Sequence, residues 1–365
     1  MKKTFLSALI GAVAFIGSSA VARTIVDDMD RTVSVPDQIQ RMVITNVYPY
    51  ASVATVFLGG TDKIVGISPV AMSAAKNGLL GELYPDIKSV QTNFMQSNSL
   101  NIEALMRLKP DVVIANAGDI PTIKQVENAG IPVVAVSTSK WNYDVVQTYD
   151  NWIKTLSTLF PEHDKSDKAA QASKRALELV QKRTAHLKPE ERKGVLFLFQ
   201  YGPKRMITSG KNFFGQYWCD AIGARNVASK IQTNNANALI NMEHVYAWNP
   251  DVVFITNFTP TLPKDLYEGT HDNWSNIKAV RNKQVYKMPL GVYRSYTPSA
   301  DTPLTLLWMA KTVYPELFSD IDLTVEVRNY YKELFGVTLT DEQIASIYTP
   351  DASRSAGFSR RPGSK

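Results

Sequence analysis

Aromatic, amide and cationic side chains gather at the ends of the strands that the sequence predicts. In parallel α/β sheets, ligands bind beyond the carboxyl ends of the strands, so residues at these positions are candidates for binding. Arg205 and Arg294 could hold anionic oxygens through paired hydrogen bonds. Tyrosines could stack on a ligand, hydrogen-bond it or ligate a hard metal as phenolates, although each could equally pack with its hydroxyl in water. The candidate ligand-binding residues are Tyr48, Tyr50, Gln96, Asn116, Tyr201, Arg205, Tyr293, Arg294 and Tyr296.

The motifs that would mark an enzyme are missing from the sequence. It contains no Gly-x-Ser-x-Gly nucleophile motif, no phosphate-binding loop and no His-Glu-x-x-His pair. The histidines do not pair at the spacing of metal ligands, and nothing near the single cysteine, Cys219, would activate it. We therefore predict a binding protein with no catalytic residues and no resident cofactor, and metal-ligating side chains stay undefined. The histidines are His163, His186, His244 and His271.

One stretch of the chain occurs twice, at residues 99–113 and 239–253, and reads each time as a short helix, a Pro-Asp stop and an apolar strand. The offset between the copies is the length of a whole domain rather than of a stacked repeat. We infer two lobes of common ancestry, because chance agreement of the whole pattern in one register is the weaker explanation. The matching residues are Asn101 with Asn241, Glu103 with Glu243, and the Pro-Asp-Val-Val runs at 110–113 and 250–253.

Buried strands alternate with helical segments in both halves, and this order predicts α/β lobes with mainly parallel sheets. Residues 161–189 are polar, with small and apolar side chains at 3–4 spacing. We expect them to form one long helix that joins the lobes, and a surface helix of either lobe is the alternative. The predicted boundaries are a signal peptide at 1–22, an N-terminal lobe at 23–160, the bridging helix at 161–189, a C-terminal lobe at 190–349 and a disordered tail at 350–365.

The N-terminal residues predict export. Lys2 and Lys3 precede an apolar run that is too short to span a bilayer, and Ala20-Val21-Ala22 form a small-residue cleavage site. We expect cleavage after Ala22 and a periplasmic protein, with no cysteine at the new terminus to carry a lipid anchor. The net charge of +6 is scattered rather than clustered, so no nucleic-acid partner is predicted.

These features resemble the periplasmic substrate-binding proteins of ABC importers for iron–siderophore complexes, haem and cobalamin. The signal peptide, the two lobes, the bridging helix and the doubled Asn-x-Glu…Pro-Asp-Val-Val carry the resemblance, together with residues 206–211 and 223–227. It covers about residues 24–345. The resemblance implies two α/β lobes on one rigid helix, a monomer, and a ligand cleft lined by residues 95–97 and 235–237, by the turn at 201–205 and by the loop at 293–294.

The resemblance also implies that one glutamate on each lobe docks against arginines of an inner-membrane ABC permease. Glu103 and Glu243 occupy those motif positions. Two exposed carboxylates on matching lobes suit a two-fold partner with paired cations. The alternative is that each glutamate only stabilises the start of its helix.

The leading interpretation is a binding protein for an anionic metal chelate, with a ferric siderophore as the first choice and with Arg205 and Arg294 offsetting its charge. Alternatives of the same class are a nickel or cobalt chelate, haem, or an oxyanion such as molybdate. A secreted α/β enzyme that uses the same cleft is the alternative of a different class, and the sequence offers it no nucleophile with a base in reach.

Overall fold

The computed structural model describes residues 22–96, 98–231 and 238–355, so the predicted signal peptide up to residue 21 and the end of the predicted tail, 356–365, lie outside it. The first lobe contains a parallel sheet in the order β4-β3-β7-β8. Its strands are apolar and buried, as expected for a parallel sheet that is covered on both faces. They are β3 (Met42–Ile44), β4 (Ile64–Ile67), β7 (Val112–Asn116) and β8 (Val133–Val136).

The second lobe repeats this plan with a parallel sheet in the order β12-β9-β14-β15 and adds an antiparallel sheet, β10-β11-β13. The parallel strands are β9 (Gly194–Leu198), β12 (Arg225–Asn226), β14 (Val252–Ile255) and β15 (Val285–Lys287). The antiparallel strands are β10 (Gln200–Gly202), β11 (Arg205–Thr208) and β13 (Ala238–Ile240).

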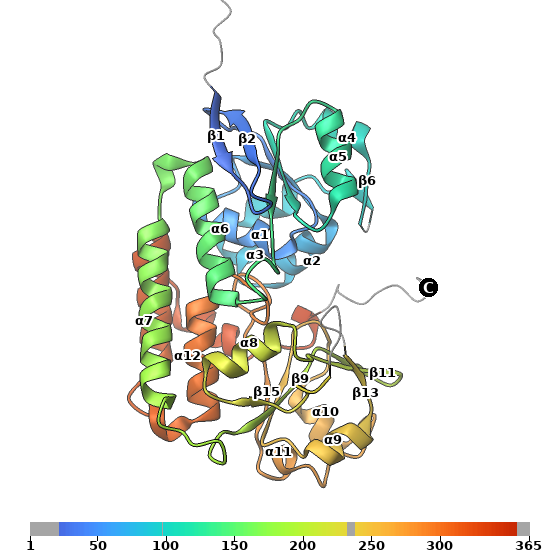
Figure 1. Ribbon diagram of the computed structural model, residues 1–365, viewed down its shortest axis with the longest axis vertical. Coiled ribbons are helices and arrows are strands. Elements are labelled where there is room, and N and C mark those ends of the chain that lie inside the picture. Colours follow the sequence, from blue (N-terminus) through green and yellow to red (C-terminus); the bar gives the residue numbers. More distant parts are fainter. Residues whose placement is uncertain (1–21, 97, 232–237, 356–365) are drawn as a thin grey trace, which may run out of the picture.

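Helices surround both sheets (Figure 1). Those of the first lobe are α1 (Tyr48–Leu58), α2 (Pro69–Asn77), α3 (Leu80–Leu83), α4 (Ile102–Arg107), α5 (Ile120–Asn128) and α6 (Val145–Leu159). The later helices are α7 (Ser166–Thr184), α8 (Phe214–Ala221), α9 (Met242–Trp248), α10 (Pro263–Glu268), α11 (Lys278–Arg281), α12 (Thr302–Val313), α13 (Leu323–Tyr330) and α14 (Asp341–Tyr348). Short antiparallel ladders join β1 (Ala22–Val26) to β2 (Thr32–Pro36) and β5 (Met95–Gln96) to β6 (Ser99–Leu100).

The duplicated motif builds the same junction in both lobes. The Asn101 side chain accepts a hydrogen bond from the third backbone N–H of α4, and Asn241 does the same for α9, so both residues are N-caps. The aspartate of each Pro-Asp pair ties its strand to the start of the neighbouring one. Asp111 accepts from the N–H of Arg41 (2.8 Å), which precedes β3, and Asp251 accepts from the N–H of Gly194 (2.7 Å), which begins β9. The asparagine and the aspartate of the motif therefore stabilise the scaffold, and the glutamate has no such structural role among the described residues of either lobe.

The bridging helix α7 belongs to both hydrophobic cores. Ala169 and Ala172 in its first half pack with the first lobe, and Ala176 and Val180 in its second half pack with the second lobe. Figure 1 shows α7 running along one side of the molecule past both lobes. At 19 residues the helix is about 28 Å long, which is enough to reach from one core to the other. The predicted architecture, two α/β lobes with mainly parallel sheets joined by a long helix, is confirmed.

The chain crosses between the lobes again after β15. Every residue from 287 to 310 is buried, and within this crossing segment Val292 and Leu304 pack in the first core whereas Leu306 packs in the second. Helices α13 and α14 then pack in the first core, although the sequence assigned residues 190–349 to the second lobe. An amphipathic stripe shows that a helix covers a core but not which core it covers.

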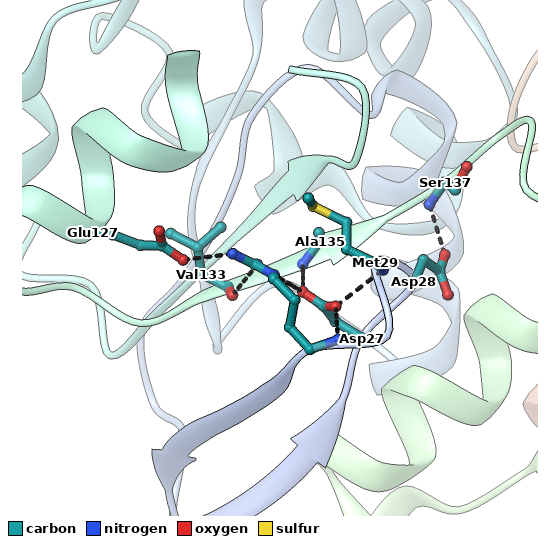
Figure 2. Close-up of polar contacts among 8 residues, drawn as sticks. Asp27, Asp28, Met29, Glu127, Val133, Ala135 and Ser137 are labelled. Carbon is teal, nitrogen blue, oxygen red and sulfur yellow. Dashed lines mark hydrogen bonds and ion pairs between the residues drawn. The ribbon is translucent and has the colours of Figure 1, made fainter. Parts of the chain in front are cut away.

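The hairpin β1–β2 and its turn cover the open edge of β8 (Figure 2). The Asp27 carboxylate accepts from the N–H of Ala135 (3.1 Å) and is paired with Arg31, which also contacts Glu127. Asp28 accepts from the N–H of Ser137 (2.6 Å), directly after β8. An edge strand is thereby closed, and the loop that leaves it toward the second lobe is anchored.

Candidate ligand-binding site

Polar side chains of the first lobe form a network at the carboxyl ends of β3 and β7. The Asn46 side-chain oxygen accepts from the backbone N–H of Asn116 (3.1 Å) and from the hydroxyl of Thr45 (3.2 Å), and its amide donates to Asp119. Asp119 is also the N-cap of α5 and accepts from the N–H of Thr122 (3.2 Å). The predicted site residue Asn116 thus lies half-buried in a fixed amide and carboxylate network.

Tyr48, the first residue of α1, lies near this network and near Tyr293 of the crossing segment. The side chain is half-buried, and its hydroxyl donates a hydrogen bond to Asn98 in the turn between β5 and β6. Burial raises the pKa of Tyr48, and Tyr293 and Asp119 raise it further. The hydroxyl of Tyr48 therefore lies close enough to Tyr293 of the crossing segment for the two to influence each other. It stays protonated at neutral pH and can donate a hydrogen bond.

Arg294 lies inside the crossing segment and is 0% exposed. Its Nε donates to the carbonyl of Asn257 (2.9 Å), and its guanidinium carbon lies 5.2 Å from the ring centre of Phe258 and 5.7 Å from that of Tyr293. These distances are those of cation–π contacts. Asn257 is held in turn, because its amide donates to the carbonyl of Met288 (2.8 Å). The second lobe therefore fixes a guanidinium in one place, at the junction with the first.

A second cation, Lys287, is buried beside this arrangement at the end of β15. Its ammonium donates to the backbone carbonyls of Thr256 (2.9 Å), Thr259 (2.6 Å) and Thr261 (2.8 Å). These bonds pin the loop 256–261, which carries the partners of Arg294. Burial lowers the pKa of Lys287 to about 7; Asp265 opposes the shift, and Arg294 adds to it. The free energy of a buried charge is high unless it is compensated, so this lysine gains from any anion nearby.

Aromatic rings form a continuous row along the strand ends of the second lobe, ending at Arg294. Consecutive ring centres lie 5.1, 6.1 and 4.8 Å apart. The members of this aromatic row, from its half-exposed end inward, are Tyr143, Phe213, Phe199 and Phe258. At the half-exposed end the row borders a cavity of about 710 Å³ between the lobes, lined by the loop 139–144, by residues from 211 to 220 in and just before α8, and by Ser229.

Three of the predicted tyrosines lie in hydrophobic cores. Tyr50 packs edge-on against Trp152 with ring centres 5.5 Å apart. Tyr201 accepts a hydrogen bond from the indole of Trp274 (2.9 Å), and its own hydroxyl donates to Asp272. Tyr296 is also fully buried; its hydroxyl pairs with Ser209, and its ring touches Phe197 and Phe199. All three have visible structural roles, and the structure does not bring them together with Tyr48.

Two other predicted residues, Gln96 and Arg205, are exposed. Arg205 begins β11 in the hairpin that follows β9, and its side chain forms no hydrogen bond or ion pair with any described residue. The predicted cleft residues Ser97 and 235–237 lie outside the described part of the chain. Of the two candidate arginines, then, one is buried at the lobe junction and the other faces solvent.

The two glutamates of the motif are exposed in the first turns of α4 and α9. Within the described residues, the carboxylates of Glu103 and Glu243 take part in no hydrogen bond or ion pair. Figure 1 shows α4 in one lobe and α9 in the other, both on the side of the molecule away from α7. The carboxylates are therefore available to a partner that spans the two lobes.

Comparison with known proteins assigns the fold and the motif to a family. Residues 47–290 match the family model described as "Periplasmic binding protein". The chain belongs to this family. Proteins of this type bind solutes for ABC transporters and are not enzymes, as the sequence predicts. Family members are periplasmic, and among the described residues of this periplasmic binding protein no helix has the length and apolarity to cross a membrane.

Several relatives of this periplasmic binding protein are similar over most of its length. The molybdate-binding protein MolA of Haemophilus influenzae is 27% identical over 94% of this chain and 99% of its own. Its molybdate-bound crystal structure has a TM-score of 0.73 at 25% identity, covering 87% of this chain and 99% of that one. A periplasmic solute-binding protein from Veillonella parvula has a TM-score of 0.80 at 28% identity, over 90% and 97% of the two chains. The Fe(3+)-citrate-binding protein YfmC of Bacillus subtilis is 24% identical over 61% of this chain and 67% of its own.

Sequence reasoning missed two residues that shape the candidate site of this periplasmic binding protein, Lys287 and Asn257. A lysine at the last position of a short apolar strand reads as the point where the strand reaches solvent. The signal that could have revealed it is the apolar Met288 that follows, and then the unbroken low-charge run up to Arg294. Asn257 follows an apolar strand as Asn116 does, and only the structure shows that its carbonyl receives Arg294.

Proposed function

We propose that the protein captures a compact oxyanion with the charge and shape of molybdate at the lobe junction and delivers it to an inner-membrane ABC permease. The fully buried guanidinium of Arg294 carries this proposal. It is fixed by Asn257 and two aromatic rings, so it is oriented before a ligand arrives, and the ligand gains a strong charge-assisted contact at little entropic cost.

The groups around Arg294 suit an anion. Partial burial of Tyr48 and full burial of Tyr293 raise the pKa of both hydroxyls, so both are neutral donors at physiological pH. Lys287 places positive charge beside the loop 256–261, whose carbonyls it binds. Among the described residues, no group of three or more His, Cys, Asp or Glu side chains could hold a metal ion. A bare metal cation would therefore find no set of protein ligands here, whereas an anion that carries its own metal or central atom would find donors.

A larger anionic chelate is the second candidate, as a ferric siderophore, a ferric citrate-like complex, a nickel or cobalt chelate, or haem. The aromatic row and the cavity of about 710 Å³ favour it, since an organic shell would stack on the rings. The cavity lining argues the other way, because it contains Lys211 but also Asp144 and Asp220. Two carboxylates against one ammonium repel an anion in this cavity, so a compact oxyanion at Arg294 fits the structure better than a chelate in the cavity.

The test is isothermal titration calorimetry with molybdate, sulfate, ferric citrate and a ferric catecholate. We expect molybdate to bind one-to-one and Arg294→Gln to weaken binding by about 30- to 1000-fold, because truncating one partner of a buried charge pair costs about 2–4 kcal/mol. Arg205→Gln is the matched control and keeps the parent affinity. Both variants are first checked for an unchanged melting temperature.

The outcomes separate the two candidates. Binding of a ferric complex without molybdate would replace the first candidate with the second. Equal molybdate affinity in the parent and in folded Arg294→Gln protein would refute the role of Arg294. Mass spectrometry of exported protein tests whether residues 1–22 are removed, as the periplasmic location proposed for this chain requires.

A further inference from the structure

Large apolar side chains are exposed at few places on the described surface, and half of these places lie in the duplicated motif. They are Val26, Met106, Ile120, Leu239, Tyr246 and Val325. Met106, Leu239 and Tyr246 fall within residues 99–113 and 239–253, which together are a small part of the chain. Single exposed apolar residues need no explanation, but their concentration beside the two glutamates does.

Met106 and Tyr246 occupy equivalent positions in the two lobes. Each lies three positions after the glutamate of its own copy, Met106 after Glu103 and Tyr246 after Glu243. Residues three apart on a helix lie on the same face, one turn from each other. Each lobe therefore presents the same pair, a carboxylate and a large apolar side chain, on the exposed face of one short helix.

The two apolar side chains are accessible and differ in rigidity. Met106 is 51% exposed and Tyr246 is 46% exposed. The hydroxyl of Tyr246 donates to the carbonyl of Asn273 (2.7 Å), which holds the ring in place on the surface. Methionine is flexible and adapts to the shape of a partner, so the two lobes could fit identical sockets with different side chains.

We propose that Met106 and Tyr246 are apolar anchors of the surface that docks on the membrane permease. Each anchor enters an apolar socket beside the cation that pairs with the neighbouring glutamate. The partner is a two-fold symmetric permease, because only a symmetric partner offers the same socket and cation twice at related positions. This inference rests on the docking role proposed for Glu103 and Glu243. It adds that the charges steer the encounter, whereas the apolar side chains supply much of the affinity.

The experiment compares variants that change one property at a time. Met106→Gln and Tyr246→Gln remove the apolar groups, Tyr246→Phe keeps the ring but removes the bond to Asn273, and Val325→Gln alters an equally exposed residue (48%) on α13. Affinity for the cognate permease–ATPase complex in nanodiscs is measured by surface plasmon resonance at low and high salt, with and without molybdate. Melting temperature and molybdate affinity are measured for every variant.

We expect each glutamine variant to weaken docking about tenfold, equivalent to about 1.4 kcal/mol, and the double variant about 100-fold. Tyr246→Phe and Val325→Gln dock like the parent. The loss in the double variant persists at high salt, whereas the effect of Glu103→Gln plus Glu243→Gln shrinks there because salt screens charges.

Each alternative result has a distinct meaning. If the double variant docks like the parent while the glutamate variants fail, the apolar anchors are refuted and the docking glutamates stand. If neither set affects docking, the docking surface lies elsewhere and both ideas fail. If the parent self-associates in sedimentation velocity and the double variant does not, the face is an interface between copies of this chain, and the permease proposal is overturned. Absence of molybdate binding in calorimetry would count against the proposed ligand alone.

Discussion

The two lobes share a scaffold and differ in the chemistry at their strand ends. In the first lobe the strands β3 and β7 end in a network of neutral amides and a carboxylate, centred on Asn46 and Asp119. In the second lobe β14 and β15 end in aromatic rings and buried cations, Phe258, Lys287 and Arg294. The N-capping asparagines and the strand-tying aspartates are nevertheless the same in both.

This difference indicates which residues of a duplicated half-molecule have the same role in both lobes and which have a role in only one. The junction of helix and strand must form in each lobe, so its residues occur in each copy. If the docking face meets a symmetric partner, as we propose, its glutamates are expected in each copy as well. A single ligand in the proposed site would touch the lobes with different atoms, so the side chains there are free to differ. On this view the second lobe selects for negative charge, and the first contributes hydrogen-bonding amides and a tyrosine hydroxyl beside the Asp119 carboxylate.

The largest effect on uptake is expected from the exposed glutamates that the two lobes share, Glu103 and Glu243. Glu103→Ala plus Glu243→Ala should reduce ligand uptake by about 100-fold or more, because a symmetric partner loses both of its charge contacts. Each single variant should reduce uptake less than the double variant does, and the two single variants should reduce it by similar factors. Uptake of radiolabelled ligand into cells that depend on this protein measures the effect, and calorimetry confirms that ligand affinity is unchanged. A single variant that accounts for the whole loss would show that the lobes do not dock equivalently.

The shared scaffold gives the second prediction. Asp111→Ala and Asp251→Ala should each lower the free energy of unfolding by about 1–3 kcal/mol, because each leaves a strand-end N–H without its acceptor. Asp251→Ala should cost more, since the N–H of the buried Gly194 is left away from water, whereas the two N–H groups that Asp111 holds belong to the exposed residues Gln40 and Arg41. Urea unfolding measures both, with the exposed Asp62→Ala as the control. A variant that unfolds at the same urea concentration as the control would mean that its aspartate does not tie the strands.

Most of the scaffold could be predicted from the sequence because its determinants are local. An N-capping asparagine, a proline stop and an apolar run lie close together in one short stretch of chain, and their repetition reveals the second lobe. The packing of α13 and α14 on the first core could not be predicted. Their apolar stripes are compatible with either core, and the choice depends on the path of the crossing segment.

The candidate site was only partly predictable, for a similar reason. The position after a buried strand identified Tyr48 and Arg294 as candidates. It also selected Tyr201 and Tyr296, whose rings the structure places in hydrophobic cores. A tyrosine at a strand end has the same sequence signature whether its ring enters the core or the cleft. The direction depends on backbone turns such as the loop 256–261, which is fixed by long-range bonds from Lys287.

The smallest expected effect is the pH dependence of ligand affinity that Lys287 causes. It is also the most direct test of whether the second lobe selects for negative charge. Burial lowers its pKa to about 7, so near neutral pH it loses the proton that attracts an anion. The affinity for molybdate should therefore fall about 3- to 10-fold between pH 6.5 and pH 8.5, and a bound anion should raise the pKa of the lysine. The charged groups that act on Lys287 are Asp265, which raises its pKa, and Arg294, which lowers it.

Folding stability should show the opposite trend with pH. The pKa of Lys287 is depressed in the folded protein relative to 10.5, so its contribution to stability is greatest above that value and is lost as the pH falls toward 7. Lys287→Met should remove both trends, while the exposed Lys264→Met should keep them. Calorimetry and urea unfolding at pH 6.5, 7.5 and 8.5 make the comparison. If the pH dependence of affinity survives in Lys287→Met, the titrating charge that the ligand senses belongs to a group other than Lys287, and Arg294 cannot be that group because it stays protonated.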